Sequence, residues 1–297
     1  MKASNGKVDI SELKLFRGEK LLVMISLLGF LLAIGVALYI GIFGNVVLPE
    51  GSLDRAFSFD AAIALFLLSI AAILPISGLS LRKRAAARWF FIPAILYAYA
   101  IETIQQFRGI NPRFSKTGSK TADIIAGALF GLDSLLIILV VVLIAISFYR
   151  KRQANERPLV VLGIRYAFLS VMFAFASGLW MIVMQSRYTG DSGNLIVLHG
   201  LGFHALQALP LLGWLSEKAR IENQYARRHI HFGSLAWTIS ILLIAVQTAL
   251  GRTVFEWTAL PILSGVMLLI WFGSVVTIVI NLIWPKTVNL DTSSHSD

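Results

Sequence analysis

The residues most able to perform chemistry in this sequence are ionisable side chains set inside long apolar runs. Glu102 lies in such a run, with Tyr99 one turn before it and with Gln105 and Gln106 three and four residues after it. These spacings place the side chains on one face of a helix. A carboxylate inside a membrane-spanning helix is costly, so it is expected to face a polar interior and to have a partner. Glu102 is therefore the first candidate for a buried functional site.

A second group of polar residues comes from a later apolar run. Gln207 falls angularly between His199 and His204, so these three side chains lie on one side of a helix. Asp133, in an earlier run, lies at nearly the same predicted depth as His204. We therefore predict two layers, one formed by Glu102 with His199 and one by Asp133 with His204. They would line a cavity that opens to the outer face of the membrane.

Other polar residues near the outer ends of the predicted helices would form the rim of this cavity. The candidate substrate-binding residues are Glu102, Gln105, Gln106, Arg108, Asp133, His199, His204, Gln207, Gln247 and Arg252. In the alternative interpretation, each polar residue only hydrogen-bonds a neighbouring helix, a contact worth about 1 kcal/mol. The four ionisable groups together favour a functional site, because they cost more to bury than amides do. Asp60, in contrast, is predicted to cap or compensate the dipole of a helix that begins near residue 58.

The loop between residues 107 and 121 is unusually basic for the outer side of a membrane. It contains four of the seven Lys and Arg residues predicted to lie there, namely Arg108, Arg113, Lys116 and Lys120. Outer loops are normally poor in basic residues, so this concentration predicts a local task, such as binding an anionic small molecule or a lipid head group. The alternative is an ordinary solvated loop.

The apolar runs define the architecture. Hydrophobic residues make up 57% of the 297 residues and charged residues 14%, well below the roughly 25% of soluble domains. Because about 20 apolar residues cross the hydrocarbon core, we predict an all-α integral membrane bundle of eight transmembrane helices within residues 20–284. Residues 1–19 and 285–297 are predicted to be a cytoplasmic segment and a disordered cytoplasmic tail. The predicted helices are 20–43, 58–79, 89–107, 122–148, 158–185, 195–215, 232–250 and 256–284.

The distribution of Lys and Arg predicts the orientation of these helices. Of the 26 basic residues, 18 lie on the side that holds both termini, seven lie on the other side, and Arg165 lies inside a run. Cytoplasmic loops are enriched in Lys and Arg, so both termini are predicted to be cytoplasmic. The net charge of +10 arises from these loops, so we expect a multi-pass protein whose partner is the lipid bilayer and not nucleic acid.

Two segments resemble an uncharacterised family of bacterial polytopic membrane proteins. One carries the family's Q-x-x-R-G motif at Gln105, Arg108 and Gly109, and the other carries H-x4-H-x-x-Q-x-x-P, which begins at His199 and ends at Pro210. The sequence departs from the family pattern at residues 112–115, which read Pro-Arg-Phe-Ser where Ser-His-Phe-Asn would stand. The resemblance implies a bacterial inner-membrane protein and supports the choice of site, but it carries no known activity.

Three function classes fit this pattern. The first is binding or transport of a small anionic or lipid-head-group substrate, with histidine and carboxylate groups suited to proton coupling. The second is an enzyme in which His199, His204 and a carboxylate hold a metal ion, although the five-residue spacing turns the two rings apart. The third is a haem protein. Eight helices with cytoplasmic termini also describe haem A synthase, and a weak echo links residues 106–109 with 247–252, but the intramembrane histidines lie on one helix only.

Overall fold

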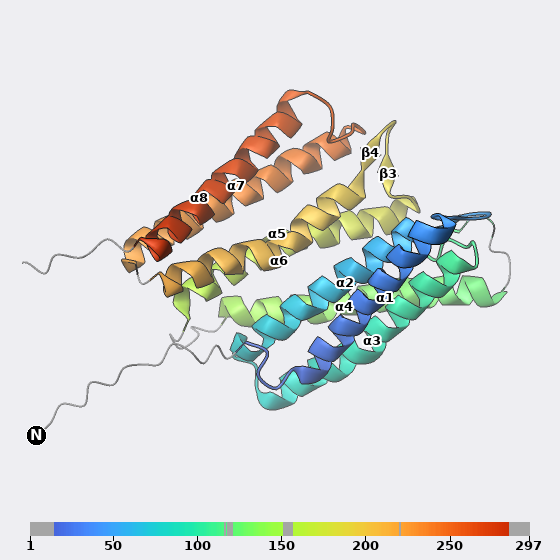
Figure 1. Ribbon diagram of the computed structural model, residues 1–297, viewed down its shortest axis with the longest axis horizontal. Coiled ribbons are helices and arrows are strands. Elements are labelled where there is room, and N and C mark those ends of the chain that lie inside the picture. The colour runs from blue at the N-terminus through green and yellow to red at the C-terminus, as the bar shows by residue number, and fades with distance from the viewer. Residues whose placement is uncertain (1–14, 116, 118–120, 151–156, 220, 285–297) are drawn as a thin grey trace, which may run out of the picture. The chain divides into compact units, whose positions relative to one another are not determined.

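The computed structural model describes residues 15–115, 117, 121–150, 157–219 and 221–284. Over these residues the chain forms eight long helices, four short strands and one 3-10 turn (Figure 1). The predicted all-α character and the eight long helices are confirmed. The predictions made for residues 1–14, for Lys116 and Lys120, and for the tail 285–297 concern residues outside the described part of the chain.

The chain divides into two compact units, Met1–Gln153 and Ala154–Asp297. The first unit contains α1 (Lys20–Phe43), β1 (Val46–Val47), β2 (Gly51–Ser52), α2 (Leu53–Ile73), η1 (Leu74–Ile76), α3 (Leu81–Phe107) and α4 (Thr121–Arg150). The second contains α5 (Pro158–Met184), β3 (Tyr188–Thr189), β4 (Gly193–Asn194), α6 (Leu195–Lys218), α7 (Asn223–Ala249) and α8 (Ala259–Ile283).

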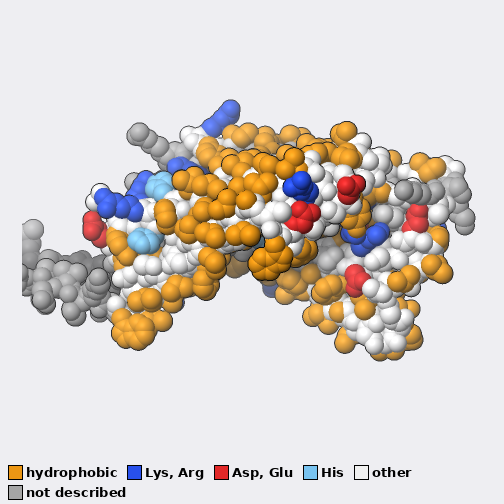
Figure 2. Space-filling model, turned by 90° about the horizontal axis from the view of Figure 1, so that it is seen from above, with side chains coloured by type: hydrophobic (Ala, Val, Ile, Leu, Met, Phe, Trp, Pro, Cys, Tyr) orange, Lys and Arg blue, Asp and Glu red, His pale blue; other side chains and the backbone are white. Residues whose placement is uncertain are grey.

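Seven of these helices are long and apolar enough to cross a membrane, so the chain is a multi-pass membrane protein. Large apolar side chains such as Leu31 and Val183 are mostly exposed, and hydrophobic side chains cover much of the face seen in Figure 2. Lipid tails are as apolar as these side chains, so this surface suits a bilayer and not water. The helix that falls outside the seven is α3, whose first turns are basic.

Three helices begin earlier than the sequence predicts. Helix α2 starts at Leu53 instead of residue 58, α3 at Leu81 instead of 89, and α7 at Asn223 instead of 232. The added turns of α3 and α7 are rich in Lys and Arg, and the hydroxyl of Ser80 accepts a hydrogen bond from the N–H of Lys83 at the start of α3. Hydropathy marks the part of a helix that suits lipid, so it misses polar turns that continue beyond it.

The early start of α2 corrects the prediction for Asp60. This residue lies two turns inside the helix, where it cannot cap the N-terminus, and its side chain is fully buried. The acidic residue in the first turn is Asp54, which accepts a hydrogen bond from the side chain of Asn45. Asp60 is therefore a buried carboxylate inside a spanning helix, and it needs the same explanation as Glu102.

The two units repeat one arrangement of elements. In each unit a helix is followed by an antiparallel two-stranded hairpin and then by three helices. Helices α3 and α7 both have 27 residues, and α7 begins and ends 142 residues after α3. The same interval separates β1 from β3, β2 from β4, and the start of α2 from the start of α6.

The buried faces of the repeated helices also correspond. Each buried position of α3 from Phe91 to Gln106 falls, 142 residues later, on a buried position of α7. Few residue types are shared, but Gln105 corresponds to Gln247 and Gly109 to Gly251. The weak sequence similarity between residues 106–109 and 247–252 is therefore part of a repeat of a whole four-helix arrangement.

A glycine fixes each hairpin to the end of a following helix. The N–H of Glu50 donates a hydrogen bond to the carbonyl of Gly109, and the N–H of Ser192 donates one to the carbonyl of Gly251, both at 2.9 Å. Both glycines have positive φ, +75° and +74°. A Cβ atom on Gly109 would lie 2.0 Å from the carbonyl oxygen of Leu48, so no side chain fits there.

We expect Gly109→Ala and Gly251→Ala each to lower the free energy of unfolding by about 1–3 kcal/mol, because the left-handed backbone and the close approach both disfavour a Cβ. Thermal or chemical unfolding of the detergent-solubilised protein measures this effect. Gly35→Ala is the control, since a Cβ on Gly35 in α1 would meet no atom within 4 Å. A control variant as unstable as the other two would contradict the argument.

Candidate functional site

Glu102 is the centre of a network of buried polar side chains in the first unit. Its side chain, on the inward face of α3, is fully buried. The Oε1 atom accepts hydrogen bonds from Arg113 Nη2 at 2.6 Å and from Gln106 Nε2 at 3.0 Å. The guanidinium group therefore balances the charge of a carboxylate that would otherwise be costly to bury.

Arg113 reaches Glu102 because the loop after α3 turns back over the end of the helix. Oδ1 of Asn111 accepts hydrogen bonds from the N–H groups of Arg113 and Phe114, at 3.1 and 3.3 Å, and this side-chain bonding favours a turn. The guanidinium carbon lies 5.2 Å from the centre of the Phe59 ring on α2. One of the four basic residues of the loop between residues 107 and 121 is thus the counter-ion of a buried carboxylate.

Asp60 is the second buried carboxylate of this network. Its Oδ2 atom accepts a hydrogen bond from Thr103 Oγ1 at 2.9 Å, and its charge is repelled by that of Glu102. Three buried atoms of the network have no hydrogen-bond partner, namely Asp60 Oδ1, Glu102 Oε2 and Tyr99 Oη. Because buried polar atoms are nearly always paired, these atoms mark a place where water, a proton or a ligand can bind.

Two glutamines connect the network to its surroundings. The Oε1 atom of Gln106 accepts a hydrogen bond from the N–H of Ser52 in the hairpin, at 2.8 Å. Gln105 Nε2 donates to Asp123 Oδ1 at 3.0 Å, and Arg108 Nη1 lies 2.7 Å from the same atom in an ion pair. The hairpin, α3 and the first turn of α4 are therefore joined by polar contacts around the site.

The structure gathers the predicted residues Glu102, Gln105, Gln106 and Arg108 in and around this one network. Asp133, also in the first unit, is half-buried on α4, and its Oδ2 atom has no hydrogen-bond partner. Its electrostatic neighbour on α3 is Tyr97. Among the described residues, no hydrogen bond or ion pair ties Asp133 to Glu102.

The predicted histidines lie in the second unit and have different surroundings. His199 Nδ1 lies 2.8 Å from the carbonyl oxygen of Ala174 and 3.3 Å from Ser177 Oγ, both on α5. His204 is exposed, and its Nδ1 lies 3.3 Å from Oε1 of Gln207. The two rings therefore have different partners, as the spacing of five residues predicts.

Gln247 lies in the last turn of α7, and Arg252 lies three residues beyond its end. Gln247 is buried, and its Nε2 atom donates to the carbonyl of Thr253 at 2.8 Å and to Glu256 at 3.4 Å, whereas Arg252 is exposed. These contacts close the turn after α7. The predicted pairings of Glu102 with His199 and of Asp133 with His204 would join the two units, and they stay predictions.

The second unit has no buried charge where the first unit has its network. The residues Gly202, Ile241, Ile244, Ala245 and Phe255 stand 142 positions after Asp60, Tyr99, Glu102, Thr103 and Arg113. Of these, Gly202, Ile241 and Ile244 are buried. The same four-helix arrangement is therefore built once with buried charges at these positions and once with uncharged residues there.

Sequence reasoning missed the roles of Asp60, Thr103, Arg113 and Asp123. Asp60 was assigned to a helix start, and Arg113 was grouped with the other charges of its loop. Asp60 lies seven positions after the start of α2, a depth at which a carboxylate needs a partner, but hydropathy does not detect the first turns of that helix and so hides this depth. No spacing in the sequence pairs Arg113 with Glu102, because the loop decides where its guanidinium lies.

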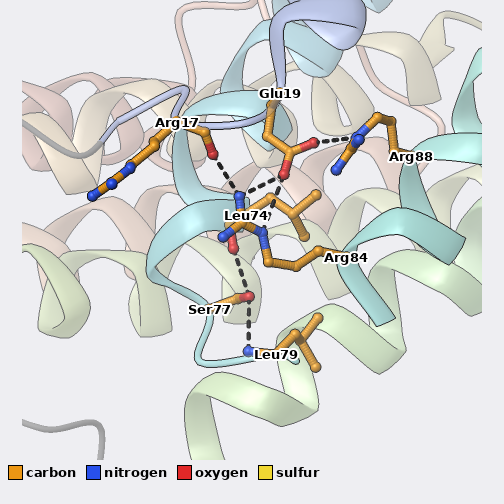
Figure 3. A network of polar contacts seen from close by, with 7 residues as sticks. All are labelled: Arg17, Glu19, Leu74, Ser77, Leu79, Arg84 and Arg88. Atoms are coloured by element: carbon orange, nitrogen blue, oxygen red, sulfur yellow. Dashed lines mark hydrogen bonds and ion pairs between the residues drawn. The ribbon is translucent and has the colours of Figure 1, made fainter. Parts of the chain in front are cut away.

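A second charged network lies at the opposite end of α3 and has a structural role. Glu19, just before α1, is fully buried and accepts hydrogen bonds from Arg84 Nη2 at 2.7 Å and Arg88 Nε at 2.8 Å (Figure 3). Arg84 also donates to the carbonyl of Arg17. Two of the four basic residues in the first turns of α3 therefore tie α3 to the start of α1.

Among the described residues, no group of three or more His, Asp and Glu side chains is arranged to hold a metal ion. The chain matches no protein-family model, no curated protein and no solved structure. The resemblance to the uncharacterised bacterial family remains an expectation from the two motifs.

Removing the counter-ion should be more harmful than removing both charges. We expect Arg113→Met to lower the free energy of unfolding by about 3–5 kcal/mol, because Glu102 is left buried and unpaired. Adding Glu102→Met should recover most of this loss, since an apolar pair needs no desolvation. Unfolding of the detergent-solubilised variants measures both effects, and equal stability of Arg113→Met and the native protein would contradict the ion pair.

Proposed function

We propose that the chain crosses a bacterial inner membrane eight times, with both termini in the cytoplasm. The seven apolar helices supply seven of these spans. Support for the eighth, α3, comes from its match to α7 in length and in buried positions, because α7 is itself apolar enough to span. The basic residues of α3 lie in its first two turns, at the end where the positive-inside rule expects them.

Cysteine labelling tests this topology, because the native chain contains no Cys. Single cysteines at Leu48 and Trp257, which are 81% and 93% exposed, should react with a membrane-impermeant maleimide added to intact cells. Cysteines at Lys83 and Asn223 should react only after the membrane is permeabilised. Labelling of Lys83→Cys and Asn223→Cys from opposite sides would contradict the proposed span of α3, because three crossings by α4, α5 and α6 without α3 would separate these two positions.

We propose further that the protein binds or transports a small substrate at the polar network around Glu102. The observation that carries this proposal is the asymmetry between the units. A charged interior is not needed to build the four-helix arrangement, since the second unit has apolar residues at the same positions. Buried ion pairs add little stability compared with apolar residues of similar size. A network that the fold does not require is therefore best explained by a function.

Two partly exposed arginines, Arg108 and Arg113, favour an anionic small molecule or a lipid head group as the substrate. Arg108 is 45% exposed in its ion pair with Asp123, so its guanidinium group can be reached from the outer solvent. Arg113 is 28% exposed in its ion pair with Glu102. An entering anion would compete with these carboxylates for the two arginines, and the exchange of partners would couple binding to a rearrangement of the network.

Reconstitution tests the transport proposal. Vesicles containing the protein should take up at least one of two probes, inorganic phosphate or acetate, or the purified protein should retain phosphatidylglycerol in native mass spectrometry. Glu102→Gln should lower the uptake rate or the retention at least about tenfold, the effect of losing ~1.4 kcal/mol. Asp54→Asn, which removes an exposed carboxylate from the start of α2, should change neither. Equal activity of Glu102→Gln and the native protein would count against this site.

A further inference from the structure

The network around Glu102 contains one more carboxylate than it has cations. Glu102 receives both the guanidinium of Arg113 and the amide of Gln106. Asp60 receives only the neutral hydroxyl of Thr103, although it is equally buried. Two buried carboxylates that share one counter-ion are costly to keep ionised together in a low-dielectric interior.

The atoms without partners lie on the side chains that surround Asp60. Tyr99 is 2% exposed and its hydroxyl makes no hydrogen bond. This hydroxyl lies close to α1. A Cβ atom added to Gly29 would be only 2.1 Å from it. Its electrostatic neighbour is Asp60. Asp60 Oδ1, Glu102 Oε2 and Tyr99 Oη are thus three buried oxygens with unused hydrogen-bonding capacity in one network.

We propose that Asp60 is a proton-binding residue whose Oδ1 atom carries a proton in the resting protein and gives it up during the substrate cycle. This inference rests on the transport function proposed above and names the ion that would be coupled to it. A proton on Oδ1 gives the network one positive and one negative charge, and it turns an unpaired acceptor into a donor. Its release would restore the repulsion between the two carboxylates until a proton returns.

A proton fits the network better than a metal cation does. A bound metal cation replaces its hydration shell with several oxygen ligands. The network offers three buried oxygens without partners, fewer than the roughly six that a hard metal cation takes. A proton needs one acceptor, and Asp60 Oδ1 is a buried acceptor without a hydrogen-bond partner.

The charged and titratable groups that face Asp60 support the same assignment. From α3 these are Glu102 and Tyr99, and from the following loop Arg113 reaches the network through Glu102. On the side of α1 the neighbouring residues are small and uncharged, namely Gly29 and Ser26. The hydroxyl of Ser26 donates a hydrogen bond to the carbonyl of Ala64 on α2. Arg113 is therefore the cation that the network uses, and it is already paired with Glu102.

Infrared difference spectroscopy of the purified protein tests the proposal, because a protonated carboxylic acid has a C=O stretching band separate from those of carboxylates and amides. We expect this band at neutral pH, a shift when all aspartates carry a ¹³C-labelled carboxyl group, and its loss in Asp60→Asn. The labelling needs no substitution, so it remains decisive if Asp60→Asn does not fold. The matched control, Asp133→Asn, should leave the band of Asp60 in place.

Three outcomes would overturn the proposal. They are the absence of the band at every pH at which the protein is folded, a band that ¹³C-aspartate does not shift, and a band lost in Asp133→Asn but kept in Asp60→Asn. The test is independent of substrate. A band with the expected behaviour in a protein that binds none of the probes would keep Asp60 as a proton site while contradicting transport.

Discussion

The pairing of buried Glu102 with Arg113 is the interaction on which the polar network of the first unit depends. A carboxylate in a low-dielectric interior needs a counter-ion, and the nearest one available comes from a loop beyond the end of α3. That requirement draws the loop back over the helix, where Asn111 shapes its turn. Gln106 then links the carboxylate to the N–H of Ser52, so the hairpin, the helix and the loop share one polar network.

The second unit shows what the same arrangement looks like without this requirement. It keeps the hairpin, the glycine with positive φ and the buried face of the third helix, but Ile244 stands where the first unit has Glu102. The hairpin contact and the apolar packing are therefore the shared basis of the fold. The charges are an addition to one unit, which is why we assign them to function and not to architecture.

The basic loop between α3 and α4 shows that charged residues which stand out in a sequence can serve as partners of buried carboxylates. Arg108 and Arg113 stand out in the sequence because outer loops are normally poor in basic residues. In the structure each is paired with a carboxylate, Asp123 or Glu102. An anionic substrate would therefore meet arginines that already have partners, and binding would have to exchange one partner for another. Such an exchange can change the charge balance around Asp60, which places substrate and proton in one network.

The sequence by itself determined the solvent, the helices and the depth of Glu102. Apolar runs of membrane-spanning length and the face shared by Glu102, Gln105 and Gln106 are local properties, so they could be read directly. Only the tertiary structure decided that Asp60 is buried beside Thr103, that Arg113 is the partner of Glu102, and that the two units repeat one arrangement. These features depend on where polar turns extend a helix and where a loop folds back. Such contacts join residues far apart in the chain, and neither hydropathy nor periodicity records them.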